Sequence, residues 1–145
     1  MSKPRRLAST SDSRMSEPKE ETVKYLVLIY HNPQSQRLWE AFSDAQRAEG
    51  LQVYAALNKD LVDSGELIAA EALADSSLAR RVSAAEGRTM ATDGPLAEVK
   101  EQLAGFYLVE CESLDRAIAI AARVPEARFG LVEVRPIMTY SGLDV

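Results

Sequence analysis

Few side chains in this sequence are of the types that perform chemistry, and His31 is the only histidine among 145 residues. An imidazole can act as a general base near neutral pH when a carboxylate orients it and a substrate proton lies within reach. His31 follows the apolar run from Lys24 to Tyr30 and precedes Asn32-Pro33, a pair that stops a strand. On a loop of this kind a solvated histidine is the simpler interpretation, and His31 stays a candidate catalytic residue.

Asp93 is the second candidate catalytic residue, because it begins the turn signal Asp93-Gly94-Pro95. A carboxylate at such a turn could act as a base or hold a polar ligand. The structural alternative is that Asp93 accepts local backbone N–H bonds, while glycine supplies a positive φ and proline fixes its own φ. Both roles are compatible with the sequence.

Four further residues are candidates for ligand binding. Glu133 and Arg135 alternate with two valines, so both lie on one face of a strand, where burial without a partner would be costly. They are expected to pair with neighbouring side chains, to pair across a dimer, or to bind an anionic ligand. Lys100 follows the Asp-Gly-Pro turn and Tyr30 ends the first apolar run, so each could face a cleft or, alternatively, solvent.

The single cysteine, Cys111, shares a strand face with Tyr107 and Val109. No basic residue is placed to lower its pKa, so we expect a packed thiol rather than a nucleophile. The sequence has no glycine-rich phosphate loop, paired metal-ligand motif or serine-nucleophile signature. It therefore indicates neither a cofactor nor a metal, and it leaves open whether the protein is an enzyme.

Length and composition favour one folded domain. The net charge of −5 suits nucleic acid poorly, since that binding draws much of its affinity from phosphate neutralisation. No apolar run approaches the ~20 residues that a membrane-spanning helix needs, and a single cysteine fits a reducing compartment. We expect a cytoplasmic protein that binds neither nucleic acid nor membrane.

Residues 1–22 are rich in Ser, Pro, Lys, Arg and Glu and have almost no large apolar side chain. This composition cannot offset its ordering entropy, so it predicts a disordered leader before a folded domain at residues 23–145. Met15 lies within the leader and is an alternative start to Met1. The leader's four acidic residues argue against a targeting peptide.

Three stretches have apolar residues at helical spacing. The first runs from Gln36 to Ala48 and is interrupted at Gly50; the second runs from Leu51 to the stop at Ser64-Gly65. A third begins after Ser113, a good N-cap, and closes at Pro125. The predicted strands are Lys24–Tyr30, Leu67–Ala70, Arg80–Ser83, Arg88–Thr92, Gly105–Cys111 and Phe129–Ile137.

This order of elements describes an α+β fold, an antiparallel sheet with helices on one face. Alternation in the first strand directs Tyr25, Val27 and Ile29 to one face and Leu26, Leu28 and Tyr30 to the other. Helices on one side cannot cover both apolar faces. We therefore predict a homodimer whose sheets meet face to face, with a small-molecule ligand in the cleft between sheet and partner.

Four blocks of this sequence resemble the YCII-related, DGPF-domain family: Lys24–Tyr30, Ser64–Leu67, Thr92–Leu108 and Val132–Met138. The resemblance implies a ferredoxin-like fold that assembles as a dimeric α/β barrel. It further implies that some relatives are encoded beside extracytoplasmic-function sigma factors, and that the wider superfamily includes small enzymes acting on cyclic or aromatic compounds.

Two departures from the family pattern bear on function. Leu96 stands where the motif usually has phenylalanine. One branch of the family has a His/Asp pair with its histidine in the first helix, and no histidine occupies that helix here, so the pair is not carried over. Two functions stay open: a small-ligand-binding homodimer linked to sigma-factor regulation, or a cofactor-free acid/base enzyme of isomerase or lyase type acting on a small cyclic or aromatic substrate.

Overall fold

The computed structural model describes residues 22–94 and 100–138. The predicted disordered leader lies outside this part of the chain except for Thr22, and so do Pro95 and Leu96. The elements follow in the order β1 (Val23–His31), α1 (Pro33–Ala41), α2 (Asp44–Ser64), β2 (Leu67–Ala72), the 3₁₀ turn η1 (Ser76–Leu78), β3 (Arg80–Ala85), β4 (Arg88–Asp93), β5 (Gln102–Cys111), α3 (Leu114–Ala122), the 3₁₀ helix η2 (Pro125–Phe129) and β6 (Val132–Pro136).

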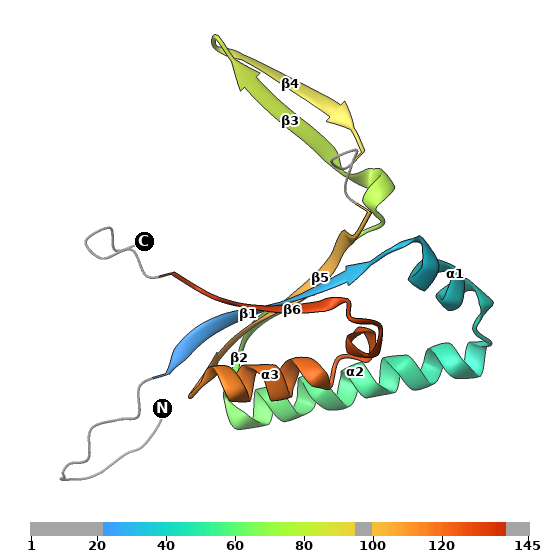
Figure 1. The fold of residues 1–145 in the computed structure, drawn as a ribbon, viewed down its shortest axis with the longest axis vertical. Coiled ribbons are helices and arrows are strands. Elements are labelled where there is room, and N and C mark those ends of the chain that lie inside the picture. Colours follow the sequence, from blue (N-terminus) through green and yellow to red (C-terminus); the bar gives the residue numbers. More distant parts are fainter. Residues whose placement is uncertain (1–21, 95–99, 139–145) are drawn as a thin grey trace, which may run out of the picture.

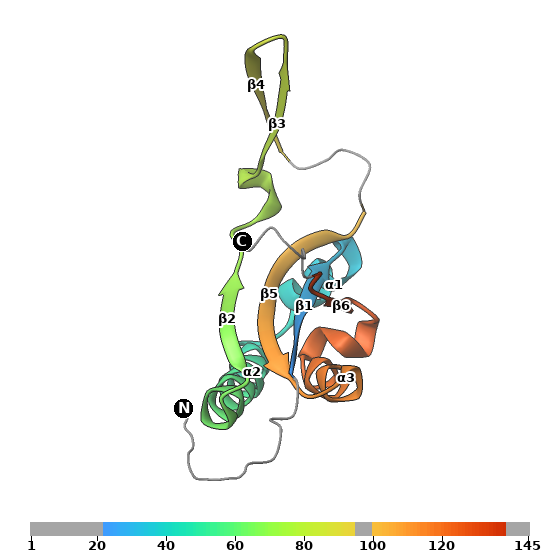
Figure 2. The same ribbon diagram turned by 90° about the vertical axis from the view of Figure 1, so that its left-hand side faces the viewer.

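Four strands form one antiparallel sheet in the order β2-β5-β1-β6. Figure 1 and Figure 2 show α2 and α3 against one face of this sheet, while α1 lies beyond the end of β1. With the β3–β4 hairpin set aside, the order is the β-α-β-β-α-β arrangement of ferredoxin-like folds. The prediction of an α+β fold with helices on one face is confirmed.

The core lies between the sheet and the two helices. Alternation along β1 and β5 sends every second side chain into it, and α2 and α3 contribute one stripe each. Fully burying an aliphatic side chain of this kind contributes about 1.5–3 kcal/mol. The largest fully buried side chains are Leu57, Leu61, Ile120, Val27, Val109 and Val124.

The opposite face of the sheet is apolar as well, and no element of the described chain covers it. Leu26 and Leu28 of β1 and Phe106 and Leu108 of β5 are half-buried there. The alternation that predicted two apolar faces is thus present, with helices on one face alone. We call the surface formed by these four residues the open face.

Gly105 allows β2 to approach β5 closely. A Cβ atom at this position would lie 2.9 Å from the backbone oxygen of Glu71, which is a steric clash with the main chain of β2. β2 also shifts register against β5 between Leu67 and Ala69. The close pairing keeps the short edge strand in the sheet.

The first helical region breaks earlier than predicted. We expected an interruption at Gly50, but α1 ends at Ala41 and Gly50 lies inside α2. Ser43 makes a capping box with Gln46, which starts a new helix seven residues before the glycine. The predicted stop at Ser64-Gly65 is confirmed, since Gly65 adopts φ 80° and donates to Leu61 and Val62 oxygens.

The last strand is shorter than predicted. Phe129 belongs to η2, and Gly130 at φ 72° turns the chain before β6 begins at Val132. The β3–β4 hairpin agrees with its prediction around Gly87: Glu86 and Gly87 both have positive φ, as a tight two-residue turn requires. This hairpin projects away from the sheet (Figure 1). None of the described helices is long and apolar enough to span a bilayer.

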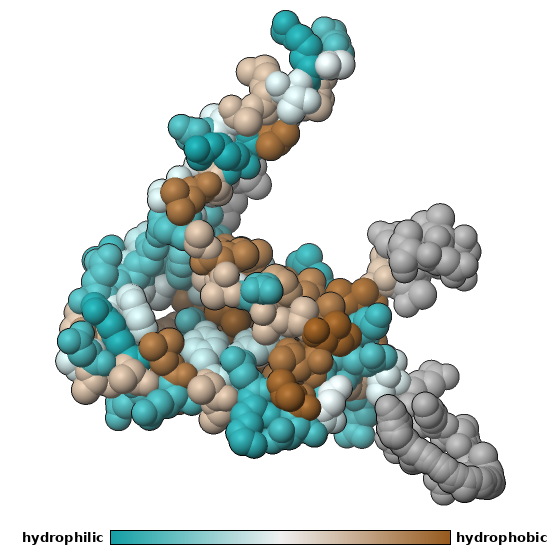
Figure 3. Space-filling model, turned by 180° about the vertical axis from the view of Figure 1, so that it is seen from behind, coloured by the Kyte–Doolittle hydropathy of each residue, from teal (hydrophilic) through white to brown (hydrophobic). Residues whose placement is uncertain are grey.

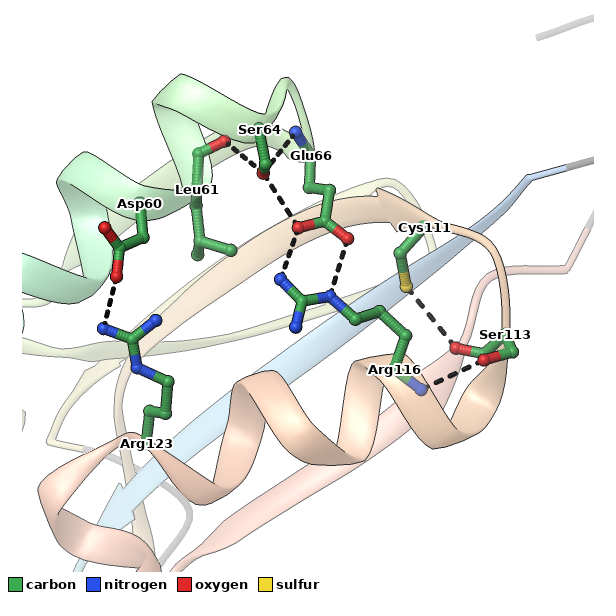
Figure 4. A network of polar contacts seen from close by, with 8 residues as sticks. All are labelled: Asp60, Leu61, Ser64, Glu66, Cys111, Ser113, Arg116 and Arg123. Atoms are coloured by element: carbon green, nitrogen blue, oxygen red, sulfur yellow. Dashed lines mark hydrogen bonds and ion pairs between the residues drawn. The ribbon is translucent and has the colours of Figure 1, made fainter.

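A polar network fastens α2 to α3 over the sheet (Figure 4). Glu66, just after α2, accepts two hydrogen bonds from the Arg116 guanidinium, at 2.9 and 2.7 Å, and one from the Ser64 hydroxyl at 2.8 Å. A second ion pair joins Arg123 to Asp60 at 2.7 Å. The bonds from Arg116 hold the pKa of Glu66 below its usual value of 4.5.

Replacing Glu66 with Gln should remove about 1 kcal/mol from the free energy of unfolding at pH 7, since the Arg116 pair is partly exposed and screened. A lowered carboxyl pKa contributes stability that is complete above pH 4.5 and is lost as pH falls through the folded-state pKa. The variant should therefore lose less stability than the wild type below pH 4.5. Urea unfolding at pH 7 and pH 3 measures both effects; the exposed Glu112→Gln is the control. Parallel pH curves for wild type and Glu66→Gln would contradict the assignment.

Candidate functional site

A hollow of about 1010 Å³ opens on the helix side of the molecule. It lies between α1, the first half of α2, η2 and the end of the sheet where β1 meets the loop after β2. Figure 3 shows the surface hollowed between α1 and the body of the protein. Its volume is at the upper end of the range for small-molecule sites.

Aromatic rings form much of the wall. Trp39 and Phe42 come from the end of α1 and meet edge to face with centroids 6.1 Å apart, Tyr54 comes from α2, and Phe129 comes from η2. Trp39 is 46% exposed, although it is the largest apolar side chain in the protein. An exposed indole inside a concavity is typical of a binding surface.

The break between α1 and α2 is what creates this wall. Arg47 of α2 donates to the backbone oxygens of Trp39 and Glu40 at 3.1 and 3.0 Å, and its guanidinium lies 5.6 Å from the centre of the Trp39 ring. The side chain thereby adds hydrogen bonds to carbonyls in the last turn of α1, where the Trp39 oxygen also accepts from the Phe42 N–H. It fixes the direction in which α1 leaves the core, and so keeps the hollow open.

His31 lies at the inner end of the hollow, as the final residue of β1. Asn32 caps α1 immediately afterwards, with its side chain accepting from the Ser35 N–H at 2.8 Å. The Nε2 atom of His31 is buried and has no hydrogen-bond partner among the described residues. The interpretation of His31 as a solvated loop residue is therefore wrong, because the strand extends through it and α1 folds back beside it.

Asp75 also lines the hollow and is close enough to His31 for the two side chains to interact electrostatically. It caps η1 by accepting from the Ser77 N–H at 3.0 Å. Hydrogen bonds from Ser77 lower the pKa of Asp75, and the nearby His31 lowers it further. Asp75 was not among the site residues predicted from the sequence, although an aspartate before Ser-Ser is a recognisable cap signal.

The remaining ionisable groups make the hollow acidic. Glu49, Asp75 and Glu126 line it, against the single cation Arg128. The Tyr54 hydroxyl donates to a Glu126 carboxylate oxygen, and burial together with this bond raises the pKa of Tyr54 strongly. One oxygen of Glu126 is thus occupied, and Tyr54 stays protonated at any physiological pH.

Three of the predicted ligand-binding residues meet on the other side of the sheet. The Tyr30 hydroxyl donates to one carboxylate oxygen of Glu133 at 3.0 Å, and Arg135 donates to the other at 2.8 Å. Burial and the Glu133 bond raise the pKa of Tyr30. Pairing with neighbouring side chains, one of the three alternatives for Glu133 and Arg135, is what the structure shows. A role for this cluster in ligand binding stays a prediction.

The other two predicted residues lie apart from His31. Asp93 ends β4 and pairs with Arg80 across the hairpin at 3.2 Å, and its side chain is 88% exposed. Lys100 is exposed, and neither residue lines the hollow. The structure thus does not bring the two candidate catalytic residues, His31 and Asp93, into one site.

The described residues offer no cluster of three or more His, Cys, Asp or Glu that could hold a metal ion. Cys111 is buried in the core, its thiol donates to the Ser113 backbone oxygen at 3.5 Å, and burial raises its pKa. It is the packed thiol expected from its position on the strand. The residues that line the hollow offer hydrogen-bonding groups and aromatic rings.

Comparison with known proteins agrees with this fold. The sequence profile of the YCII-related domain matches residues 23–141. An uncharacterised protein of Rhizobium meliloti (strain 1021) is 35% identical over 118 residues, which cover 80% of this chain and 93% of the relative. The matched region includes every strand and helix described above.

Proposed function

The chain belongs to the YCII-related domain family, and we propose that this member is a homodimer that binds a small molecule in the hollow beside His31. The observation that carries the proposal is the aromatic-walled hollow lined by His31, whose buried Nε2 atom has no hydrogen-bond partner among the described residues. A buried polar atom without a partner costs about 1–3 kcal/mol, and a ligand that hydrogen bonds to it recovers that energy.

The walls indicate what kind of molecule fits. Trp39, Phe42 and Phe129 offer faces and edges of rings to a planar, largely apolar body. The acidic groups outnumber Arg128 three to one, so an anion would be repelled. The ligand is a neutral or cationic planar molecule with one group that hydrogen bonds to His31 Nε2.

The dimer forms through the open face. Its centre is apolar, and alternation places charged residues of both signs around it: Lys24, Glu71, Glu110, Glu133 and Arg135. An apolar centre with a polar rim is the usual anatomy of a protein interface. A two-fold contact of this face with its own copy would give the dimeric α/β barrel that the family resemblance implies. A ligand-binding dimer of this kind suits a sensor in sigma-factor regulation.

A second function is favoured by the presence of His31 and Asp75 in the lining of one hollow. An imidazole and a carboxylate in the same site are the groups that general acid–base catalysis most often uses. The Nε2 atom of His31 has no hydrogen-bond partner among the described residues. Turned toward the hollow, this nitrogen could remove a proton from a bound cyclic compound without a cofactor. Isomerisation and elimination both begin with that step.

Ligand binding can be followed through Trp39, because it is the only tryptophan in the chain. 4-Nitrobenzyl alcohol, a neutral planar quencher with a hydroxyl group, should quench Trp39 fluorescence saturably. Its anionic counterpart 4-nitrobenzoate should bind at least about tenfold more weakly, because the hollow is acidic. His31→Phe should weaken binding of the alcohol about tenfold by removing the hydrogen bond to Nε2.

Lys24→Ala, on the far side of the sheet, is the matched control and should leave the quenching curve unchanged. Unsaturable quenching of equal strength by both probes, in wild type and His31→Phe alike, would rule out a built site in the hollow.

Proton abstraction makes a separate prediction in deuterium oxide. If His31 is a general base, a cyclic ketone such as 2-indanone should exchange its acidic protons faster in the presence of the protein. His31→Asn should lose at least about a hundredfold of that exchange, in the range that general bases contribute, and Asp75→Asn should lose less. Mass spectrometry of the recovered ketone measures the exchange. Equal rates of proton exchange with wild type and His31→Asn would contradict a general base at His31 and would leave ligand binding as the proposed function.

The dimer is tested by Leu108→Glu at the centre of the open face. Burying a new carboxylate in the interface should raise the dimer dissociation constant at least about a hundredfold, while half-exposure in the single chain lets the variant fold. Sedimentation equilibrium measures the constant, and the 63% exposed Val62→Glu on α2 is the control. A wild-type protein that sediments as a monomer at 50 μM or so would refute the dimer.

A further inference from the structure

The β3–β4 hairpin is the least supported part of the described chain. All twelve residues of its two strands are exposed, and it pairs with no strand of the main sheet. We propose that this hairpin is an arm that packs against a second copy of the chain, an inference that rests on the homodimer proposed above. The arm comprises residues Arg80–Asp93.

A lone two-stranded hairpin is marginally stable in water, because it has no third strand or helix to pack against. Here six residue pairs remain in register from Arg80–Asp93 to Ala85–Arg88. The base is closed by a hydrogen bond from the Gly94 N–H to the Ala79 oxygen at 2.7 Å. A hairpin this regular, with no surface of the described chain against it, indicates that another molecule supplies the surface on which it packs.

The two sides of the ribbon differ in chemistry. The first side, which we call the Val82 side, has Val82 opposite Ala91 and Ala84 opposite Thr89, with the Arg80–Asp93 ion pair at its base. The other side carries Met90 and Ala85 together with two arginines, Arg81 opposite Thr92 and Arg88 opposite Ala85. An apolar centre without net charge makes the Val82 side the one that is buried.

The described part of the same chain does not cover this side. Figure 1 and Figure 2 show the hairpin extending beyond the end of the sheet, away from α2 and α3. Val82 stays 63% exposed, and Leu78 at the base of the arm stays 68% exposed. Six residues per strand give the arm a length of about 20 Å, enough to reach past its own sheet to a neighbouring subunit.

Charge and symmetry favour a second copy as the occupant. The arm has three arginines against two acidic residues, a balance of +1, while the remainder of the chain carries −6. A basic arm is therefore attracted to the acidic body of another copy. If the open faces meet about a two-fold axis, each arm projects from the edge of the contact. The two-fold rotation then places each arm against the body of the other copy.

The test compares Val82→Asp with Ser83→Asp, which add the same charge to opposite sides of one strand. Val82→Asp should raise the dimer dissociation constant about tenfold, and Ser83→Asp should change it less than about twofold. Both positions are exposed in the single chain, so neither change threatens the core. Sedimentation equilibrium of the full chain measures the constants, and circular dichroism verifies the fold.

Hydrogen exchange provides a second, variant-free measurement. Amides of β3 and β4 should be protected at 100 μM or so and should exchange quickly at the low concentration where the dimer separates. Equal dimer dissociation constants for Val82→Asp and Ser83→Asp, together with amide exchange that does not depend on protein concentration, would refute the contact between the arm and a second copy. If Leu108→Glu on the open face dissociates the dimer while Val82→Asp and Ser83→Asp do not, the proposed arm contact is refuted and the proposed open-face dimer is supported. A wild type that is monomeric would refute both.

Discussion

The central strand β1 carries apolar side chains on both faces, whereas the helices of one chain can cover only one of them. Tyr25, Val27 and Ile29 are buried beneath α2 and α3, and Leu26 and Leu28 stay half-exposed on the open face. Every larger feature follows from this constraint. The Glu66–Arg116 network holds the helices on their face, and no element of the described residues covers the opposite face.

The hollow is a consequence of how the chain leaves β1. Two capping boxes, at Asn32 and Ser43, start two helices in quick succession, so that α1 turns away from the core rather than continuing into α2. Trp39 and Phe42 are thereby held at the side of the molecule instead of inside it. His31 lies at the junction of strand and helix, where its Nε2 atom is removed from water without a hydrogen-bond partner among the described residues. The proposed binding site therefore depends on the same short segment that starts the two helices.

The sequence predicted those parts of the fold that depend on local signals. Alternation in β1 and β5, the Ser113 cap, the Gly65 stop and the turn at Gly87 act over a few residues, and each is present in the structure. Gly50 was misleading because a glycine lowers helix propensity by about 1 kcal/mol, which packing readily overrides. The Ser43 capping box, a stronger signal, lies seven residues before it.

The site was harder to predict because it joins distant segments. His31 and Asp75 are separated by the whole of α1, α2 and β2, and nothing near either residue indicates the other. Asp93 drew attention through its turn motif, yet in the structure it pairs with Arg80 on the arm. Alternation did place Glu133 and Arg135 on one face, but the hydrogen bond from Tyr30 to Glu133 depends on the register between β1 and β6.

The most direct test of the account is a crystal structure of the full chain soaked with 4-nitrobenzyl alcohol. The account predicts density for the ring against Trp39, with the hydroxyl oxygen within about 3.2 Å of His31 Nε2. A structure in which α1 closes over the hollow, His31 Nε2 bonds to a side chain and the probe lies elsewhere would contradict it.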